Sequence, residues 1–336
     1  MNLRKDPTDQ QRRRALRGLA VVGALSPNLA SAQPAANDWP TRPLRIIVPF
    51  GPGSTPDVFA RLISERLSPV LRQPVLVENR IGAGGNVGTD AVAKAAADGY
   101  TVGVSITGPL VNNTVLYRSM PYDPFKDLAP VTLGAHQPNV LVVSSALGVE
   151  TLPQLLDLLR RKPGQFNYAS VGAGTVSHLS MELIKARTGT FVVHVPYNAS
   201  PAAVLSILQG DTHMASLAPL AVMPQVQAGK LKALAVTTRE RSVFVPGVPT
   251  CREMGLPEIE ATAWLGVVAP ARTPAPIIAR LNAEIVAILK DPAVIEKLRA
   301  VYMEPAGGTP AAFAAFMQDE LRRWEPVIRR SGASID

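Results

Sequence analysis

Apolar residues recur along the chain in two alternating patterns. Short β-branched runs occupy 44–48, 74–78 and 100–106, and stretches with apolar residues three or four positions apart occupy 57–70 and 89–97 between them. Buried strands produce the first pattern and amphipathic helices produce the second. The alternation of strand and helix predicts right-handed βαβ units and a mainly parallel sheet.

A second series of the same kind begins near residue 138. It predicts strands at 139–143, 166–170, 192–195, 214–217 and 231–236, with helices at 151–161, 178–187 and 201–209. One more strand at 262–268 follows, and then helices at 274–289, 292–300 and 310–331. This last strand and these helices do not form a third lobe, so we assign them to the first. We therefore predict an interrupted first lobe, 38–138 and 262–336, and a second lobe, 139–261.

The predicted fold class is therefore α/β, with two lobes joined by two crossings of the chain. Each lobe is expected to be a mainly parallel sheet flanked by helices. Open α/β sheets bind ligands at the carboxyl ends of their strands. The cleft between the two lobes is the expected site.

The first 32 residues have the three parts of a secretory leader. A basic segment with Arg12-Arg13-Arg14 is followed by the short apolar stretch 18–25 and by Ala30-Ser31-Ala32, a small-x-small cleavage pattern. These parts predict export, with cleavage after Ala32. Residues 12–17 also resemble a twin-arginine signal, although Ala15 stands where a bulky apolar residue is usual, so both export routes stay open.

Composition excludes several classes of function. Of the 336 residues 47% are hydrophobic and 18% are charged, and half of the net charge of +8 lies in the leader. The other Lys and Arg residues are dispersed, which argues against a nucleic-acid partner. No apolar run after residue 33 is long enough to span a membrane, so the mature chain is not expected to be membrane-embedded. The single cysteine, Cys251, allows no internal disulfide and is interpreted as structural.

Motifs for catalysis, metals and nucleotides are missing from the chain. The four histidines, His136, His178, His194 and His213, lack partners at metal-ligand spacing. There is no Gly-x-Ser-x-Gly motif, and Ser177 and His178 are adjacent and would point about 100° apart on a helix. The glycine-rich loop 82–88 has Val87 where a dinucleotide loop needs its third glycine. We therefore expect no metal, no cofactor and no catalytic residue.

Three loops at predicted strand ends are suited to holding an anion. Residues 51–57 and 170–178 combine glycines and hydroxyls with the start of a helix, and residues 105–108 follow a third strand. Free backbone N–H groups and a helix dipole favour an anion at a helix start. Each loop taken alone is equally consistent with an ordinary helix cap. Together they predict an uncharged, hydrogen-bonding cleft for a carboxylate.

Ordered motifs along the chain resemble one receptor family. They include VPFGPGSTPD at 48–57, VENRIGAGGN at 77–86, and further matches at 97–101, 121–124, 167–170, 174–178, 194–197, 228–236 and 263–266. On these residues the mature chain resembles the Bug-type receptors, the extracytoplasmic solute-binding subunits of tripartite tricarboxylate transporters. The resemblance covers about 39–328.

The resemblance implies a periplasmic binding protein of the Venus-flytrap type, similar to the type II class. Such a receptor captures a small carboxylate and passes it to a membrane permease. The implied carboxylate-holding residues are Gly53, Ser54, Thr55, Asp57, Ser170, Gly174, Thr175 and Ser177. Phe50, Ser105, Thr107, Gly108, Gly172, Tyr197 and Leu217 complete the candidate ligand-binding set. Asp57 has two open roles: meeting a ligand amino group, or capping a helix start.

Two departures from the family pattern bear on the ligand. After Tyr197 the family usually has Lys-Gly, whereas this chain has Asn198-Ala199. Near Leu217, where the family commonly has Asp or Asn, the run 214–219 carries no charge. Both changes remove polarity from the expected cleft. They predict a ligand with an apolar end, such as an aromatic or branched monocarboxylate, rather than citrate.

Two other functions share some of these features. A ligand-presenting sensor subunit for a membrane two-component kinase would have the same cleft and a different partner. A secreted α/β hydrolase would need a catalytic dyad, which the spacing search does not find. We expect a binding protein rather than an enzyme, and a monomer, as is usual for hinge-bending receptors.

Overall fold

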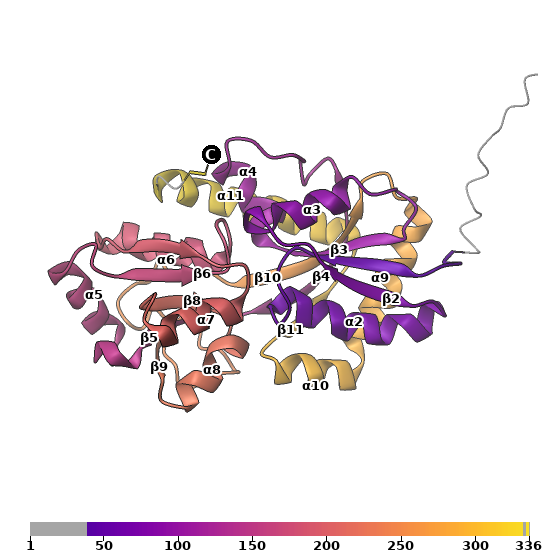
Figure 1. The fold of residues 1–336 in the computed structure, drawn as a ribbon. Coiled ribbons are helices and arrows are strands. Elements are labelled where there is room, and N and C mark those ends of the chain that lie inside the picture. Colours follow the sequence, from indigo (N-terminus) through magenta and orange to yellow (C-terminus); the bar gives the residue numbers. More distant parts are fainter. Residues whose placement is uncertain (1–38, 332–333, 336) are drawn as a thin grey trace, which may run out of the picture. The chain divides into compact units, whose positions relative to one another are not determined.

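The structure is a computed structural model that describes residues 39–331 and 334–335 (Figure 1). The leader and its cleavage site lie outside the described residues. Residues from Trp39 onward form one compact unit built around two sheets. No helix in the described part of the chain is long and apolar enough to cross a membrane.

The first sheet has six strands in the order β11-β4-β10-β3-β1-β2. In chain order these are β1 (Leu44–Val48), β2 (Val75–Asn79), β3 (Thr101–Ile106), β4 (Leu128–Gln137), β10 (Ala263–Pro270) and β11 (Glu304–Gly307). Strand β1 pairs in parallel with β2 and β3, whereas β10 is antiparallel to both β3 and β4. Strand β11 pairs antiparallel with β4.

The second sheet has five strands in the order β7-β6-β8-β5-β9. They are β5 (Val140–Ser144), β6 (Asn167–Ser170), β7 (Val193–Pro196), β8 (Met214–Leu217) and β9 (Leu231–Val236). Strand β6 is parallel to β7 and β8, whereas β5 is antiparallel to β8 and β9. The predicted α/β class with two sheets is confirmed. The expectation of mainly parallel sheets is wrong, because both sheets are mixed.

The direction in which the chain crosses between the sheets explains the mixed pairing. Strand β4 carries the chain out of the first sheet, and β10 brings it back, so Gln137 pairs with Ala263 in an antiparallel register. Strand β5 enters the second sheet and β9 leaves it, so Val140 pairs with Val236 in the same way. The lobe boundaries stay a prediction, because residues from Trp39 onward cluster as one unit.

Helices cover both sheets. Those packed with the first sheet are α2 (Thr55–Leu71), α3 (Asn86–Ala93), α9 (Ala275–Lys290), α10 (Pro292–Ala300) and α11 (Pro310–Ser331). Those packed with the second are α5 (Leu152–Arg161), α6 (Val176–Thr188), α7 (Ser200–Gln209) and α8 (Pro219–Gln227). After β3, a π-helix (Gly108–Asn112) leads into α4 (Asn113–Leu116). Strands β4 and β11 and helices α4 and α8 were not predicted from the sequence.

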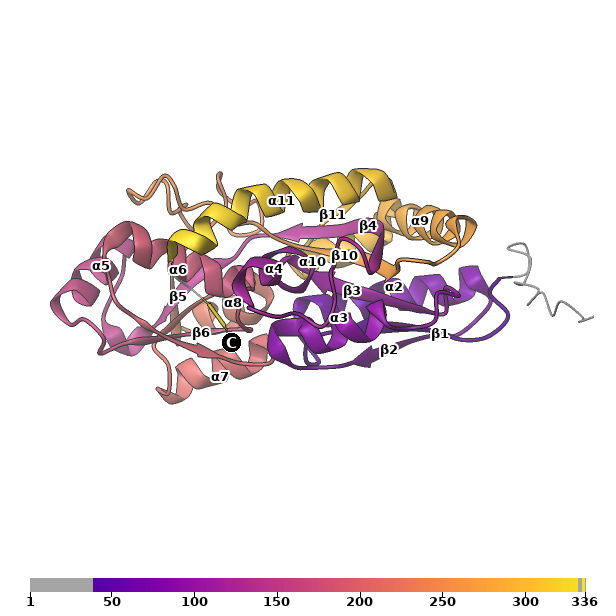
Figure 2. The ribbon, with the colours of Figure 1, turned by 90° about the horizontal axis from the view of Figure 1, so that it is seen from above.

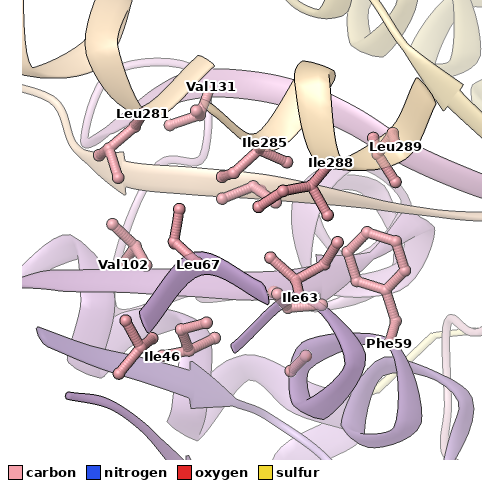
Figure 3. Close-up of a cluster of buried hydrophobic side chains, with 14 of the residues drawn as sticks. Ile46, Phe59, Ile63, Leu67, Val102, Val131, Leu281, Ile285, Ile288 and Leu289 are labelled. Atoms are coloured by element: carbon pink, nitrogen blue, oxygen red, sulfur yellow. The ribbon is translucent and has the colours of Figure 1, made fainter. Parts of the chain in front are cut away.

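The core of the first sheet explains why α2 and α9 form where they do. Phe59, Ile63 and Leu67 recur at helical spacing on α2, and all three are buried. They point toward Leu281 and Ile285 of α9 in one buried cluster (Figure 3). Full burial of each such side chain contributes about 1.5–3 kcal/mol. This packing fixes the axis of α2, and with it the position of the α2 N-terminus.

The last helix connects the two sheets through a separate apolar cluster. Figure 2 shows α11 extending from beside β4 to α6. Trp324 and Ile328 of α11 pack with Leu116 and with Val176 and Leu179 of α6. Contacts with α11 and with Leu116 of α4 therefore fix the position of the α6 N-terminus.

Candidate ligand-binding site

A cavity between the two sheets contains about 610 Å³ of space free of protein atoms, part of it open to solvent. The wall consists of Phe50, Ser54, Thr55, Pro56, Ile106, Thr107, Ala135, His136, Gln137, Asn139, Val171, Thr175, Val176, Ser177, Ser200, Leu217, Ala218, Ala263, Trp264, Leu265 and Met303. Both sheets therefore contribute to one site.

Four helices begin at this wall. Ser54 and Thr55 lie at the start of α2, and Thr175 precedes α6. Ser200 begins α7 and Ala218 immediately precedes α8. The first N–H groups of a helix have no partner within the helix, and each N-terminus carries a partial positive charge. The cavity therefore favours an anion, although its wall has no lysine or arginine.

The loop before α2 is held by hydrogen bonds within the first sheet. Ser54 Oγ donates to the carbonyl of Gly51 at 2.6 Å, and the Asp57 carboxylate accepts from Gly53 N at 2.9 Å. Asp57 also accepts hydrogen bonds from Arg61 and Asn79. Burial would raise the pKa of Asp57, but these hydrogen bonds outweigh it and lower the pKa below its ordinary value. Asp57 fixes the loop and is not part of the cavity wall.

The loop before α6 is likewise held by hydrogen bonds within the loop itself. Thr175 Oγ1 donates to the carbonyl of Gly172 at 2.6 Å and lies 2.8 Å from Ser177 Oγ. Ser177 Oγ accepts from Val171 N at 3.1 Å. These hydroxyl groups, like that of Ser54, bond within their own loops. The donors that the loops leave for a ligand are the backbone N–H groups of the first helical turns.

Two hydrogen bonds join the sheets around the cavity. Asn112 Nδ2 donates to the carbonyl of Gly174 at 3.0 Å, and Gly51 N donates to the carbonyl of Asn198 at 3.2 Å. Each bond connects a loop beside the first sheet with a loop of the second. Glycine at 51 and 174 lets these segments approach closely, since a Cβ would lie 3.0 Å from Ala199 Cβ at Gly51 and 1.8 Å from Asn113 Oδ1 at Gly174.

The candidate residues from the sequence separate into two groups. Those that line the cavity are Phe50, Ser54, Thr55, Thr107, Thr175, Ser177 and Leu217. Those that do not line it are Gly53, Asp57, Ser105, Gly108, Ser170, Gly172, Gly174 and Tyr197. Some of the second group hold the loops that carry wall residues: Gly53 N donates to Asp57 in the loop before α2, and Gly172 accepts from Thr175 Oγ1 in the loop before α6. Their proposed contact with ligand stays a prediction.

Sequence reasoning missed the part of the wall that comes from β4 and β10. Ala135, His136 and Gln137 end β4, and 263–265 begin β10. Strand β4 was not predicted, and the antiparallel β10 presents its amino end to the cavity. The β4 residues lie at the carboxyl end of a strand that was not predicted, and a search restricted to carboxyl ends could not find the residues at the amino end of β10. The apolar residues of 263–268 were the one available signal.

His136 is the one titratable side chain in the wall. Burial lowers the pKa of His136, and Glu320 opposes that shift. The ring is therefore neutral at neutral pH and adds no positive charge to the cavity. Beside it, Trp264 donates its indole N–H to Glu320 of α11 at 2.8 Å, which fixes the aromatic part of the wall.

A serine and a histidine that are distant in sequence meet behind the α6 loop. Ser170 Oγ lies 2.6 Å from His194 Nε2, a pair that the spacing search did not predict. Ser170 is completely buried and its Oγ accepts from Gly172 N at 3.0 Å. Burial, with a contribution from His178, lowers the pKa of His194 to about 3. An imidazole with this pKa is a poor base near neutral pH, so the pair is not a nucleophile and its base.

The stacked rings of His178 and His194 predict acid sensitivity. Their centroids are 4.2 Å apart, and burial lowers the pKa of His178 to about 4. Both groups bind protons less readily in the folded chain than in the unfolded chain, whose histidines titrate near 6.5. Stability is therefore complete above about pH 6.5 and falls toward pH 4, by up to about 1.4 kcal/mol per pH unit for each histidine.

Urea unfolding between pH 4 and pH 8 measures this slope. We expect His194→Asn to flatten the slope more than His213→Asn does, because burial also lowers the pKa of His213 but its ring lies outside the stacked pair. An unchanged slope in His194→Asn would contradict the assignment to this pair.

The remaining groups that could carry chemistry are metal-binding side chains and the thiol of Cys251. Within residues 39–331 and 334–335 there is no group of three or more His, Cys, Asp or Glu side chains that could hold a metal ion. Cys251 is buried, and burial raises the pKa of its thiol to about 12. That position supports the structural interpretation of Cys251.

The fold and the cavity are typical of a solute-binding protein built on two sheets, and comparisons with known proteins identify its family. The family described as "Tripartite tricarboxylate transporter family receptor" matches residues 59–333. Protein BugT of Bordetella pertussis is 39% identical over 319 residues, covering 94% of this chain and 98% of BugT. The chain belongs to this family of receptors, which includes the Bug proteins, and its members are solute-binding receptors, not enzymes.

Solved structures agree with this assignment. An R. palustris protein solved with adipate superposes with a TM-score of 0.86 at 37% identity, covering 88% of this chain and 99% of that one. MatC from Rhodopseudomonas palustris, solved with bound malate, has a TM-score of 0.82 at 32% identity, covering 86% and 100%. The periplasmic binding protein BugD has a TM-score of 0.83 at 28% identity, covering 88% and 99%.

Proposed function

We propose that this receptor captures a small carboxylate with an apolar body in the cavity between its two sheets. The observation that carries the proposal is the convergence of four helix N-termini on a wall without lysine or arginine. Backbone N–H groups and helix dipoles stabilise a carboxylate there. The relatives solved with adipate and malate support a carboxylate ligand; because both of those acids are dicarboxylates, the preference for one charged end rests on the cavity wall of this chain.

Two threonines supply further donors for the carboxylate. Thr107 Oγ1 is buried and has no hydrogen-bond partner among the described residues. Thr55 Oγ1 accepts from Gln137 Nε2 at 3.0 Å, and its own proton is left for a ligand. Gly108, next to Thr107, packs against the backbone of Gly174. Thr55 thus lies at the start of α2, and Thr107 lies directly after β3, close to the loop before α6.

The rest of the wall favours a ligand with one charged end. It is apolar over Phe50, Ile106, Ala135, Val171, Val176, Leu217, Ala218, Ala263, Trp264, Leu265 and Met303. A second carboxylate would lose its hydration there without gaining a cationic partner. We therefore favour an aromatic or branched monocarboxylate over citrate.

We also propose a mature form, an oligomeric state and a membrane partner for this receptor. The mature chain begins after Ala32, works as a monomer and delivers the ligand to a permease of the tripartite tricarboxylate type. Membership of the receptor family supports this partner. The alternative partner is a membrane two-component kinase. Permease genes next to this gene would favour transport, and a kinase–regulator pair would favour sensing.

Thermal unfolding of residues 33–336 against a panel of carboxylates tests the ligand class. The protein is first unfolded and refolded, which removes any ligand that it carries from the expression host. A ligand at about 100 times its Kd adds roughly 2.7 kcal/mol of stability and is expected to raise the Tm by several degrees. Amides of the same acids serve as uncharged controls and are expected to give no shift.

The outcomes of this panel are distinct. A shift with an aromatic or branched acid, and none with its amide, supports the proposal. Larger shifts with citrate or malate would overturn the proposal that the ligand has an apolar body, but they would still support a carboxylate ligand. No shift with any acid, together with turnover of an ester panel, would overturn the binding function itself.

A further inference from the structure

Gln137 carries an unpaired polar atom on the cavity wall. It is the last residue of β4, and its Nε2 donates to Thr55 Oγ1 at 3.0 Å. Its Oε1 is buried and has no hydrogen-bond partner among the described residues. A buried polar atom that stays unpaired has lost its hydration without compensation, and native sites satisfy such atoms with a ligand or with ordered water. A ligand in this cavity would therefore gain by offering a partner to Gln137.

The chemistry of the amide restricts that partner. In either orientation of the Gln137 amide, one polar atom pairs with the Thr55 hydroxyl and the other is left for the cavity. A hydroxyl group fits both orientations because it can donate and accept. A second carboxylate would be poorly compensated by a neutral amide, and the wall offers no lysine or arginine. The amide therefore suits a neutral hydroxyl.

The position of Gln137 locates this hydroxyl relative to the carboxylate. Thr55 is the first residue of α2, one of the helix N-termini proposed to hold the carboxylate. The Gln137 amide is bonded to Thr55 and so lies next to that position. On the other side, Gln137 pairs with Ala263, where the apolar wall of 263–265 begins. A hydroxyl near the carboxylate and an apolar body beyond it match this order.

We infer that Gln137 selects a hydroxycarboxylate, by bonding through its side-chain amide to a hydroxyl close to the ligand's carboxylate. The inference deepens the proposed function and rests on it. Gln137 is thus a specificity-determining residue, whereas the helix N-termini would stabilise the carboxylate group of any such ligand.

Matched acids with and without a hydroxyl test the inference. Calorimetric titration of the refolded protein would compare two parent acids, 3-phenylpropanoate and 4-methylpentanoate. Each would be compared with its own 2-hydroxy and 3-hydroxy derivatives. We expect one hydroxy isomer to bind about tenfold more tightly than its parent acid, as one satisfied buried hydrogen bond would give. In Gln137→Met, which keeps the length of the side chain but lacks the amide, that preference is expected to disappear while the parent acid still binds.

Gln225→Met is the matched control. Gln225 Oε1 is also buried without a partner, but Gln225 lies on α8 away from the cavity wall. Its substitution is expected to leave the preference for the hydroxy acid unchanged, and Gln137→Ala provides a second variant if Gln137→Met does not fold. The inference is overturned if the wild type binds the parent acids at least as tightly as all their hydroxy derivatives, or if Gln137→Met keeps the preference. Failure of every carboxylate to bind the wild type would instead overturn the proposed function.

Discussion

Replacing Gly174 with alanine is expected to weaken carboxylate binding by at least about tenfold. A Cβ at this position would lie 1.8 Å from Asn113 Oδ1, and Gly174 has φ +76°. Asn113 is buried and its Nδ2 donates to Asn86 Oδ1 at 2.6 Å, so to relieve the clash either this side chain gives up that bond or the loop before α6 moves away from the first sheet. That movement breaks the hydrogen bond from Asn112 to the Gly174 carbonyl and displaces the α6 N-terminus from the cavity. Loss of that bond alone accounts for about a factor of ten.

Calorimetric titration with the best acid of the panel measures this effect, and Gly189→Ala is the control. Gly189 ends the same helix with φ +67°, but a Cβ there would meet nothing within 4 Å. Both variants carry left-handed strain of about 1–2 kcal/mol, so both are expected to unfold at lower temperature. Only Gly174→Ala is expected to lose affinity. Wild-type affinity in Gly174→Ala would show that contact between the sheets at this loop does not support binding.

Replacing Trp324 with alanine is expected to lower the free energy of unfolding by about 3–5 kcal/mol. Trp324 is 1% exposed and packs with Leu116, Val176 and Leu179, which joins α11 to α6. Its indole N–H lies 3.2 Å from Glu320 Oε2, the same oxygen that accepts from Trp264 of the cavity wall. Removing the ring leaves a cavity in this cluster and removes one of the donors that stabilise the buried carboxylate.

Urea unfolding followed by circular dichroism measures the loss, and Trp324→Phe separates its two causes. Phenylalanine keeps most of the apolar ring and removes the indole N–H, so a loss of only about 1 kcal/mol is expected. If Trp324→Ala cost less than about 1 kcal/mol, the cluster between α11 and α6 would not be a main support of the α6 N-terminus. A loss in Trp324→Phe as large as that in Trp324→Ala would assign the effect to the hydrogen bond.

The loops that begin α2 and α6 could be predicted because their determinants are local. Glycine, hydroxyl residues and a helical run that follows define such a loop within about ten residues of sequence. Ser54, Thr55, Thr175 and Ser177 accordingly lie at the cavity wall. What their side chains do there was not predictable. The hydroxyls of Ser54, Thr175 and Ser177 bond within their own loops, and Asp57 is occupied by Arg61 and Asn79.

The α/β class, the alternation of strands and helices, the receptor family and the helix starts that line the cavity could all be inferred from sequence, because each depends on residues close together in the chain. The mixed pairing of both sheets, the contribution of Gln137 and Trp264 to the wall, and the contact of Asn112 with Gly174 became visible only in the folded chain. Strand direction and contacts between sheets depend on residues far apart in sequence. Apolar periodicity reports which face of an element is buried, but it carries no information about which distant element covers that face.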